Sequence, residues 1–193
     1  MKRYVYTFLF AFLLIFYAQP RQAADVADLQ GQIKGLFSSF TANFSYSTSS
    51  GELYSGKIYY QYPDKLHVRL SDGRIIATNG RFLWTYNSAS RICAKQTVLG
   101  SAGGLFGFLQ GDYTVHADNG RYTFKWRGET RSEISIKVDG GILKSVQFKS
   151  KNDVTNASFS NVVTDTSMKA SLFSYKPDPD AQLIENPLNR IGL

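Results

Sequence analysis

The sequence contains little of what most enzymes and metalloproteins need for their chemistry. Among its 193 residues there are one cysteine, Cys93, and two histidines, His67 and His116. A single cysteine excludes an internal disulfide, and no cluster of His, Cys, Asp and Glu has the spacing of a metal site. Phosphate loops, dinucleotide fingerprints and nucleophile motifs are also missing. We therefore expect no enzyme activity, no cofactor and no metal.

The three scarce residues are expected to have structural roles. Cys93 lies between Ile92 and Ala94 in a strand-like run, which favours a small buried hydrophobe over a reactive thiol. His67 lies on the polar side of an alternating segment and His116 in a short run of its own. Neither histidine has a nucleophile beside it, so both are interpreted as surface or hydrogen-bonded residues.

Blocks of charge are also absent. Lys and Arg number 22 against 15 Asp and Glu, which gives a formal net charge of +7. The basic residues are scattered singly along alternating segments, a pattern typical of a solvated sheet face and not of nucleic-acid binding. A modest attraction to anionic membranes or acidic proteins stays open.

Long apolar runs are confined to the start of the chain. Lys2 and Arg3 precede the apolar run Tyr4–Tyr17, and small residues follow at Ala23 and Ala24. This order predicts a secretory signal over residues 1–23, cleaved near Ala23 or Ala24, and hence an exported protein. The alternative, a membrane anchor, needs roughly 20 apolar residues, and this run is shorter.

Length and composition predict one domain after the signal. Residues 24–180 are enough for a single domain with a substantial core. Asp, Pro and Asn predominate from Pro177 onward, so residues 181–193 are expected to form an irregular tail.

Strict alternation of apolar and polar residues dominates the mature chain. In Gly51–Asn87, Leu66 and Val68 alternate with polar neighbours, and Asp72–Gly73 and Asn79–Gly80 have the residues of tight hairpin turns. The same alternation returns in three further stretches. These are Ser90–Val98, Tyr113–Lys149 with turns at Asn119–Gly120 and Gly140–Gly141, and a region with strands around Ala157–Val163 and Leu172–Pro177.

Helical spacing occurs once, in Asp25–Phe44. The apolar residues there predict an amphipathic helix to about Ser39 and a strand from Phe40. Gly31 and Gly35 weaken that helix by about 1 kcal/mol each relative to Ala, so docking must stabilise it. The predicted fold is mainly β (α+β): a strongly curved antiparallel sheet of roughly ten strands, or incomplete β-barrel, covered by an N-terminal helix and a short helical lid.

Leu99–Asp112 differs from the strands around it. Four large apolar residues stand among five glycines, and Leu105, Phe106, Phe108 and Leu109 are the apolar ones. Two interpretations remain open, a short buried turn and a mobile apolar flap.

Three segments resemble the outer-membrane lipoprotein carrier family, the LolA-like proteins. They are Gly56–Pro63, with a glycine, alternating aromatics and a proline, then Asp64–Leu70, and Ile76–Asn87, with Leu-Trp-x-Tyr-Asn. A weaker resemblance runs from Leu29 to about Pro179. It implies a curved sheet with a helical lid at 99–112, a cargo of lipoprotein acyl chains, an inner-membrane lipoprotein-releasing transporter and an outer-membrane acceptor. The protein is expected to be a monomer.

An apolar cavity is the predicted binding site. A curved sheet lined with large, stiff aromatics and capped by short helices leaves room for an acyl chain, although an ordinary filled core is an alternative. The residues predicted to line or close the cavity are Tyr60, Leu66, Val68, Trp84, Tyr86, Leu105, Phe106, Phe108, Leu109, Phe124, Trp126, Ile136 and Phe148.

Two alternatives to the lipoprotein carrier remain. The family typically has an arginine before the proline of the second strand, which resembles a latch to the lid, and this chain has Tyr62 there. An aromatic ring cannot replace the guanidinium's hydrogen bonds, which gives weight to a general lipid- or glycolipid-binding protein of the same fold. A small outer-membrane β-barrel would also alternate along its strands, but the N-terminal helix and the glycine-rich flap argue against it.

Overall fold

The computed structural model describes residues 24–51, 53–98, 113–126, 132–150 and 153–187. Two predictions fall outside the described residues, namely the signal at 1–23 and the flap at 99–112. The end of the predicted tail, residues 188–193, lies outside them as well.

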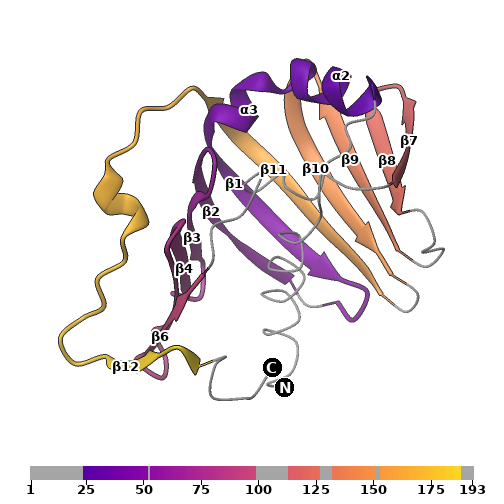
Figure 1. Cartoon of the computed structure of the whole chain (residues 1–193). Coiled ribbons are helices and arrows are strands. Elements are labelled where there is room, and N and C mark those ends of the chain that lie inside the picture. The colour runs from indigo at the N-terminus through magenta and orange to yellow at the C-terminus, as the bar shows by residue number, and fades with distance from the viewer. Residues whose placement is uncertain (1–23, 52, 99–112, 127–131, 151–152, 188–193) are drawn as a thin grey trace.

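The described chain forms one strongly curved sheet that does not close (Figure 1). The strand order is β12-β6-β5-β4-β3-β2-β1-β11-β10-β9-β8-β7, and every neighbouring pair is antiparallel except β12 and β6. The predicted mainly β, curved antiparallel sheet is therefore confirmed. The strands are β1 (Ser39–Thr48), β2 (Leu53–Gln61), β3 (Lys65–Leu70), β4 (Ile75–Asn79), β5 (Phe82–Asn87), β6 (Ile92–Thr97), β7 (Tyr113–Asp118), β8 (Arg121–Trp126), β9 (Glu133–Asp139), β10 (Ile142–Lys149), β11 (Val154–Thr164) and β12 (Gln182–Glu185).

The predicted hairpin turns join these strands. Gly73, Gly80 and Gly120 have φ of 85°, 86° and 73°, the left-handed region that tight turns require and that glycine enters at little cost. These turns make β3, β4 and β5 sequential neighbours, and likewise β7 and β8.

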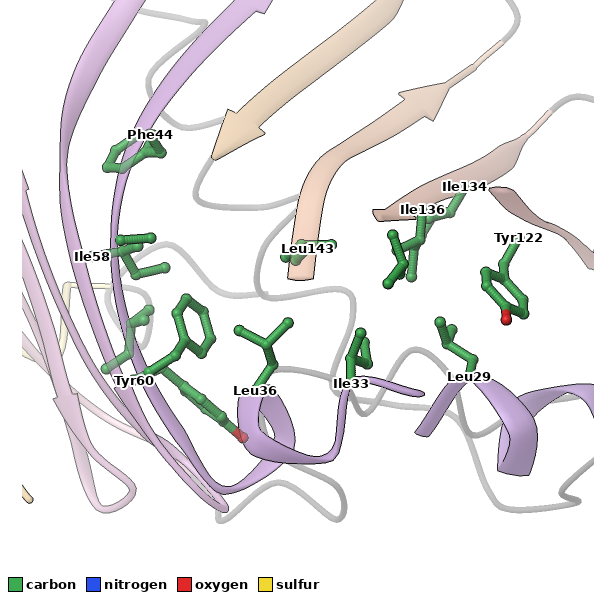
Figure 2. Packing of buried hydrophobic residues seen from close by; sticks show 14 of the residues in the cluster. Leu29, Ile33, Leu36, Phe44, Ile58, Tyr60, Tyr122, Ile134, Ile136 and Leu143 are labelled. Atoms are coloured by element: carbon green, nitrogen blue, oxygen red, sulfur yellow. The ribbon is translucent and has the colours of Figure 1, made fainter. Parts of the chain in front are cut away.

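Helices form only a small part of the fold. The predicted N-terminal helix is two short pieces, α2 (Ala24–Gln32) and α3 (Lys34–Ser38), with Ile33 between them. Leu29, Ile33 and Leu36 are at most 1% exposed and belong to the main core. Figure 2 shows these three side chains directed at residues of the sheet. We call the face of the sheet that they contact the inner face.

The opposite, outer face of β3–β6 is crossed by residues 165–187, which we call the strap (Figure 1). The strap contains a 3₁₀ turn, η2 (Ala170–Phe173), which contacts β3 and β4, and then β12, which pairs with β6. Two expectations are corrected here. Leu172–Pro177 is not a strand, and the segment expected to be irregular contains β12, because the exposed edge of β6 provides hydrogen-bond partners that local composition does not reveal.

Two apolar clusters result. The larger cluster lies on the inner face, between the sheet and α2 and α3. The smaller one lies under the strap and contains Ala77, Trp84 and Cys93, with Phe82, Tyr86 and Tyr175 packed against it. None of the helices in the described part of the chain has the length and apolar character needed to span a bilayer.

Candidate functional site

The inner face is an apolar surface shared by most strands of the sheet, because alternate residues of paired strands project to the same side. In register across the centre, Gly56 opposes Phe44, Phe44 opposes Phe159, and Ala157 opposes Val146. Eighteen described residues of the larger cluster are buried. Half-buried apolar residues pack against that core: Tyr54, Leu70, Ile76, Val115, Val146, Phe148, Ala157, Phe159 and Val162.

Six of the predicted site residues come together on this face. Five are buried in its core, and Phe148 is half-buried beside them. The five are Tyr60, Leu66, Val68, Phe124 and Ile136. Trp126 belongs to β8, while the predicted closing residues, Leu105, Phe106, Phe108 and Leu109, lie outside the described residues.

Trp84 and Tyr86 lie on the outer face, and their assignment to the cavity is corrected. Ala77, on β4, is in register with both His67 and Trp84, so Trp84 projects away from Leu66 and Val68. The Tyr86 ring stacks on the strap, with its centroid 5.6 Å from that of Tyr175. Strand β5 is covered on both faces. Its larger apolar side chains face the strap and not the helices.

Sequence reasoning also missed inner-face residues. Phe44 and Tyr46 of β1 are 8% and 7% exposed, and Phe159 of β11 is half-buried beside Phe44. The alternation through Phe40, Ala42, Phe44 and Tyr46 was the available signal, since it places four apolar side chains on one face of a central strand.

Polar groups of the inner face are tied to the protein itself. The Tyr122 hydroxyl donates to Asp28 Oδ2 in α2 at 3.1 Å, and the Tyr60 hydroxyl donates to the Pro63 carbonyl at 3.0 Å. Burial raises the pKa of Tyr113, whose ring meets Phe124 edge-on at 5.3 Å, to about 12. Tyr113 is therefore neutral at physiological pH, and the surface is suited to apolar contact.

The described part of the chain shows no site for metal-dependent chemistry. Among the described residues, no three His, Cys, Asp or Glu side chains gather closely enough to hold a metal ion. The inner-face residues are instead aliphatic and aromatic, so what the arrangement offers is apolar area.

Comparison with known proteins gives structures but no sequence relatives. No protein-family model and no curated protein matches the chain. An uncharacterized conserved protein from Thermus thermophilus aligns over 83% of this chain and 99% of its own, with 12% identity and a TM-score of 0.60. In the complex of MucA and MucB from Pseudomonas aeruginosa, the match covers 83% of this chain and 64% of that one, with 13% identity and a TM-score of 0.50.

A LolA superfamily protein from Nitrosomonas europaea also matches, over 80% of this chain and 98% of its own, with 13% identity and a TM-score of 0.45. The matches to the Thermus thermophilus protein and to the MucA and MucB complex, at TM-scores of 0.60 and 0.50, show a shared fold. At these identities the likeness extends to the fold alone.

Proposed function

We propose that this protein is a periplasmic carrier that binds acyl chains against the inner face and moves them towards the outer membrane. Residues 1–23 would direct export and then be removed. The observation that carries the proposal is the set of half-buried aromatic and aliphatic side chains that pack against the buried core of the inner face, Tyr54 and Phe159 among them. When an apolar ligand covers such a surface, the free energy of the complex falls because apolar area is removed from water.

The energetics suit a reversible carrier. Burial of one CH₂ contributes about 0.8 kcal/mol, so a chain of about 15 carbons gains roughly 10 kcal/mol before ordering costs. A carrier must also release its cargo, which shallow contacts and a cover with two states of similar free energy would allow. In this proposal the segment 99–112 is the cover.

The proposed cargo follows from the resemblance. It is the acyl chains of lipoproteins, received from an inner-membrane releasing transporter and passed to an outer-membrane acceptor. Tyr62 favours a second candidate, a lipid- or glycolipid-binding protein without that release step. Its side chain is 55% exposed and its N–H donates to the Ser38 carbonyl at 2.7 Å, so the position expected to hold a latch presents a ring to solvent.

Displacement of a fluorescent fatty acid tests the proposal with two variants of one strand. Phe159 of β11 lies on the inner face, and Val163 of the same strand is 54% exposed on the outer face. We expect Phe159→Ser to weaken binding by about tenfold, which corresponds to about 1.4 kcal/mol, and Val163→Ser to bind like the parent. Equal affinity of the parent and a folded Phe159→Ser protein would remove the inner face as the binding site.

A further inference from the structure

The outer face of β8–β11, which the strap does not cover, contains a polar hollow of about 250 Å³. Its wall includes two cations, Arg121 and Lys137, and two serines, Ser145 and Ser158. The four residues form one row across the sheet, because Lys137 is in register with Arg121 on one side and Ser145 on the other, and Ser145 is in register with Ser158.

The row places two positive charges side by side, and its one acid, Asp118 of β7, is in register with Arg121 on the side away from Lys137. Directly opposed residues on neighbouring strands have Cβ atoms about 5 Å apart, and like charges in such a pair destabilise the sheet. Within the described residues, neither Arg121 nor Lys137 forms an ion pair, and the Ser145 and Ser158 hydroxyls form no hydrogen bond. All four groups are therefore available as donors.

A parallel row on the same three strands shows the usual solution. Lys125 of β8 and Lys149 of β10 flank Glu133 of β9, with Nζ to carboxylate distances of 3.6 and 3.8 Å. In the hollow, Lys137 occupies the β9 position that Glu133 has in that row. Glu133 thus has a cation on both neighbouring strands, whereas Lys137 has Arg121 on one side and Ser145 on the other and no acid directly opposite it.

The lining beside that row, which we call the floor of the hollow, consists of the neutral polar residues Ser135, Gln147 and Asn156. Gln147 Nε2 donates to Asn156 Oδ1 at 2.7 Å, and the Thr123 and Ser135 hydroxyls are 3.0 Å apart. With that bond formed, the Asn156 NH₂ and the Gln147 carbonyl oxygen retain hydrogen-bonding capacity of both kinds. A neighbouring hydroxyl of a ligand, which both donates and accepts, matches this floor.

We propose that the hollow binds a phosphate ester with adjoining hydroxyls, of the glycerol phosphate kind, either free or as a lipid headgroup. The phosphate oxygens receive hydrogen bonds from Arg121, Lys137 and the two serines, in the charge-assisted geometry that guanidinium and phosphate favour. The volume equals roughly eight waters at about 30 Å³ each, which exceeds the need of a bare oxyanion and leaves room for the glycerol. This site is on the opposite face from the acyl site and does not depend on it.

Isothermal titration with sn-glycerol 3-phosphate tests the hollow. We expect the parent to bind and the double variant Arg121→Gln, Lys137→Gln to bind at least tenfold more weakly. The matched control is Lys125→Gln, Lys149→Gln, which removes the same amount of charge from β8 and β10 outside the hollow and should change affinity less than twofold. A parent that does not bind, or two double variants that lose affinity equally, overturns the proposal.

Vesicles identify the source of the phosphate ester. If the site takes a lipid headgroup, the parent should sediment with phosphatidylcholine vesicles containing phosphatidylglycerol, and the Arg121, Lys137 double variant should sediment less. If the ligand is free in solution, titration shows binding and the vesicles do not distinguish the two proteins. Because the double variant keeps the inner face intact, fatty-acid displacement should be the same in both proteins, which separates this site from the proposed carrier function.

Discussion

His67 shows how one side chain links two parts of the fold. It is 3% exposed on the outer face of β3. Its Nδ1 donates to the Leu172 carbonyl in the strap at 2.7 Å, and its Nε2 accepts from Arg69 Nε at 3.1 Å. This pair of partners fits the neutral imidazole with its proton on Nδ1, since a proton on Nε2 would face the Arg69 donor.

The histidine should therefore make stability depend on pH. Burial lowers the pKa of His67 below its usual value, the bond to Leu172 opposes that shift, and the Arg69 charge adds to it. A lowered folded-state pKa means that the unfolded chain binds the proton more readily. The stabilisation is complete above the unfolded pKa of about 6.5 and is lost as the pH falls below it.

Urea unfolding between about pH 7.5 and pH 5 measures this dependence. We expect the midpoint to fall with pH in the parent and to change much less in His67→Gln. His116 is exposed on β7, so His116→Gln should keep the pH dependence of the parent. An identical pH profile for His67→Gln and the parent would contradict the role assigned to this residue.

At the residue scale, the sequence predicted which side chains are apolar better than it predicted which face of the sheet they occupy. Alternation correctly identified Leu66, Val68 and Ile136 as buried, because only one face of those segments is apolar. It failed for Trp84 and Tyr86, since the strap covers the outer face of β5 and is more than 70 residues away along the chain. Which apolar set faces the helices is decided by that long-range contact and not by the local pattern.

Among the elements, β2 and β3 leave no room for a side chain at Gly56. A Cβ built there would lie 2.1 Å from the Arg69 carbonyl oxygen, so Gly56→Ala must separate two central strands. We expect it to lower the free energy of unfolding by about 2–3 kcal/mol. Gly31 of α2 is the matched control, because nothing lies within 4 Å of its Cβ position, and Gly31→Ala should stabilise by up to about 1 kcal/mol. Denaturant unfolding of both variants checks the pair.

The strap has a buried anchor in its 3₁₀ turn. Phe173 of η2 is fully buried against the outer face, and truncation of such a side chain to alanine typically costs about 3–5 kcal/mol. We expect Phe173→Ala to show that loss in thermal unfolding and to make the strap sensitive to limited proteolysis. Leu183 of β12 is 47% exposed, so Leu183→Ala should stay within about 0.5 kcal/mol of the parent. A protease-resistant strap in Phe173→Ala would refute the anchor.

The elements that the sequence predicted and those it did not differ in whether their stabilising contacts are local or distant along the chain. Hairpin strands such as β3, β4 and β5 carry their own turn residues, so local rules suffice. β12 is not joined to its partner by a hairpin and has no strong alternation, and it becomes a strand because the β6 edge lies beside it. Leu172, Phe173 and Tyr175 were the available signal that the segment packs against something.

For the whole molecule, the secretory signal predicted at residues 1–23 gives a test that needs no ligand. Removal of residues 1–23 lowers the formal net charge from +7 to +4. If the carrier function is correct, osmotic shock of cells that express the full chain should release a protein whose N-terminus lies close to Ala24, as intact mass would show. Retention of the chain in the membrane fraction until detergent is added would exclude a freely diffusing carrier.

The two faces of β9 carry a further consequence. Ile134, Ile136 and Val138 are at most 5% exposed on one side, while Ser135 and Lys137 face the hollow on the other. Strand β9, a single layer of peptide, thus separates the apolar core from the polar hollow. A shift of one residue in the register of β9 would move every one of its side chains to the other face, whereas a shift of two would restore the pattern.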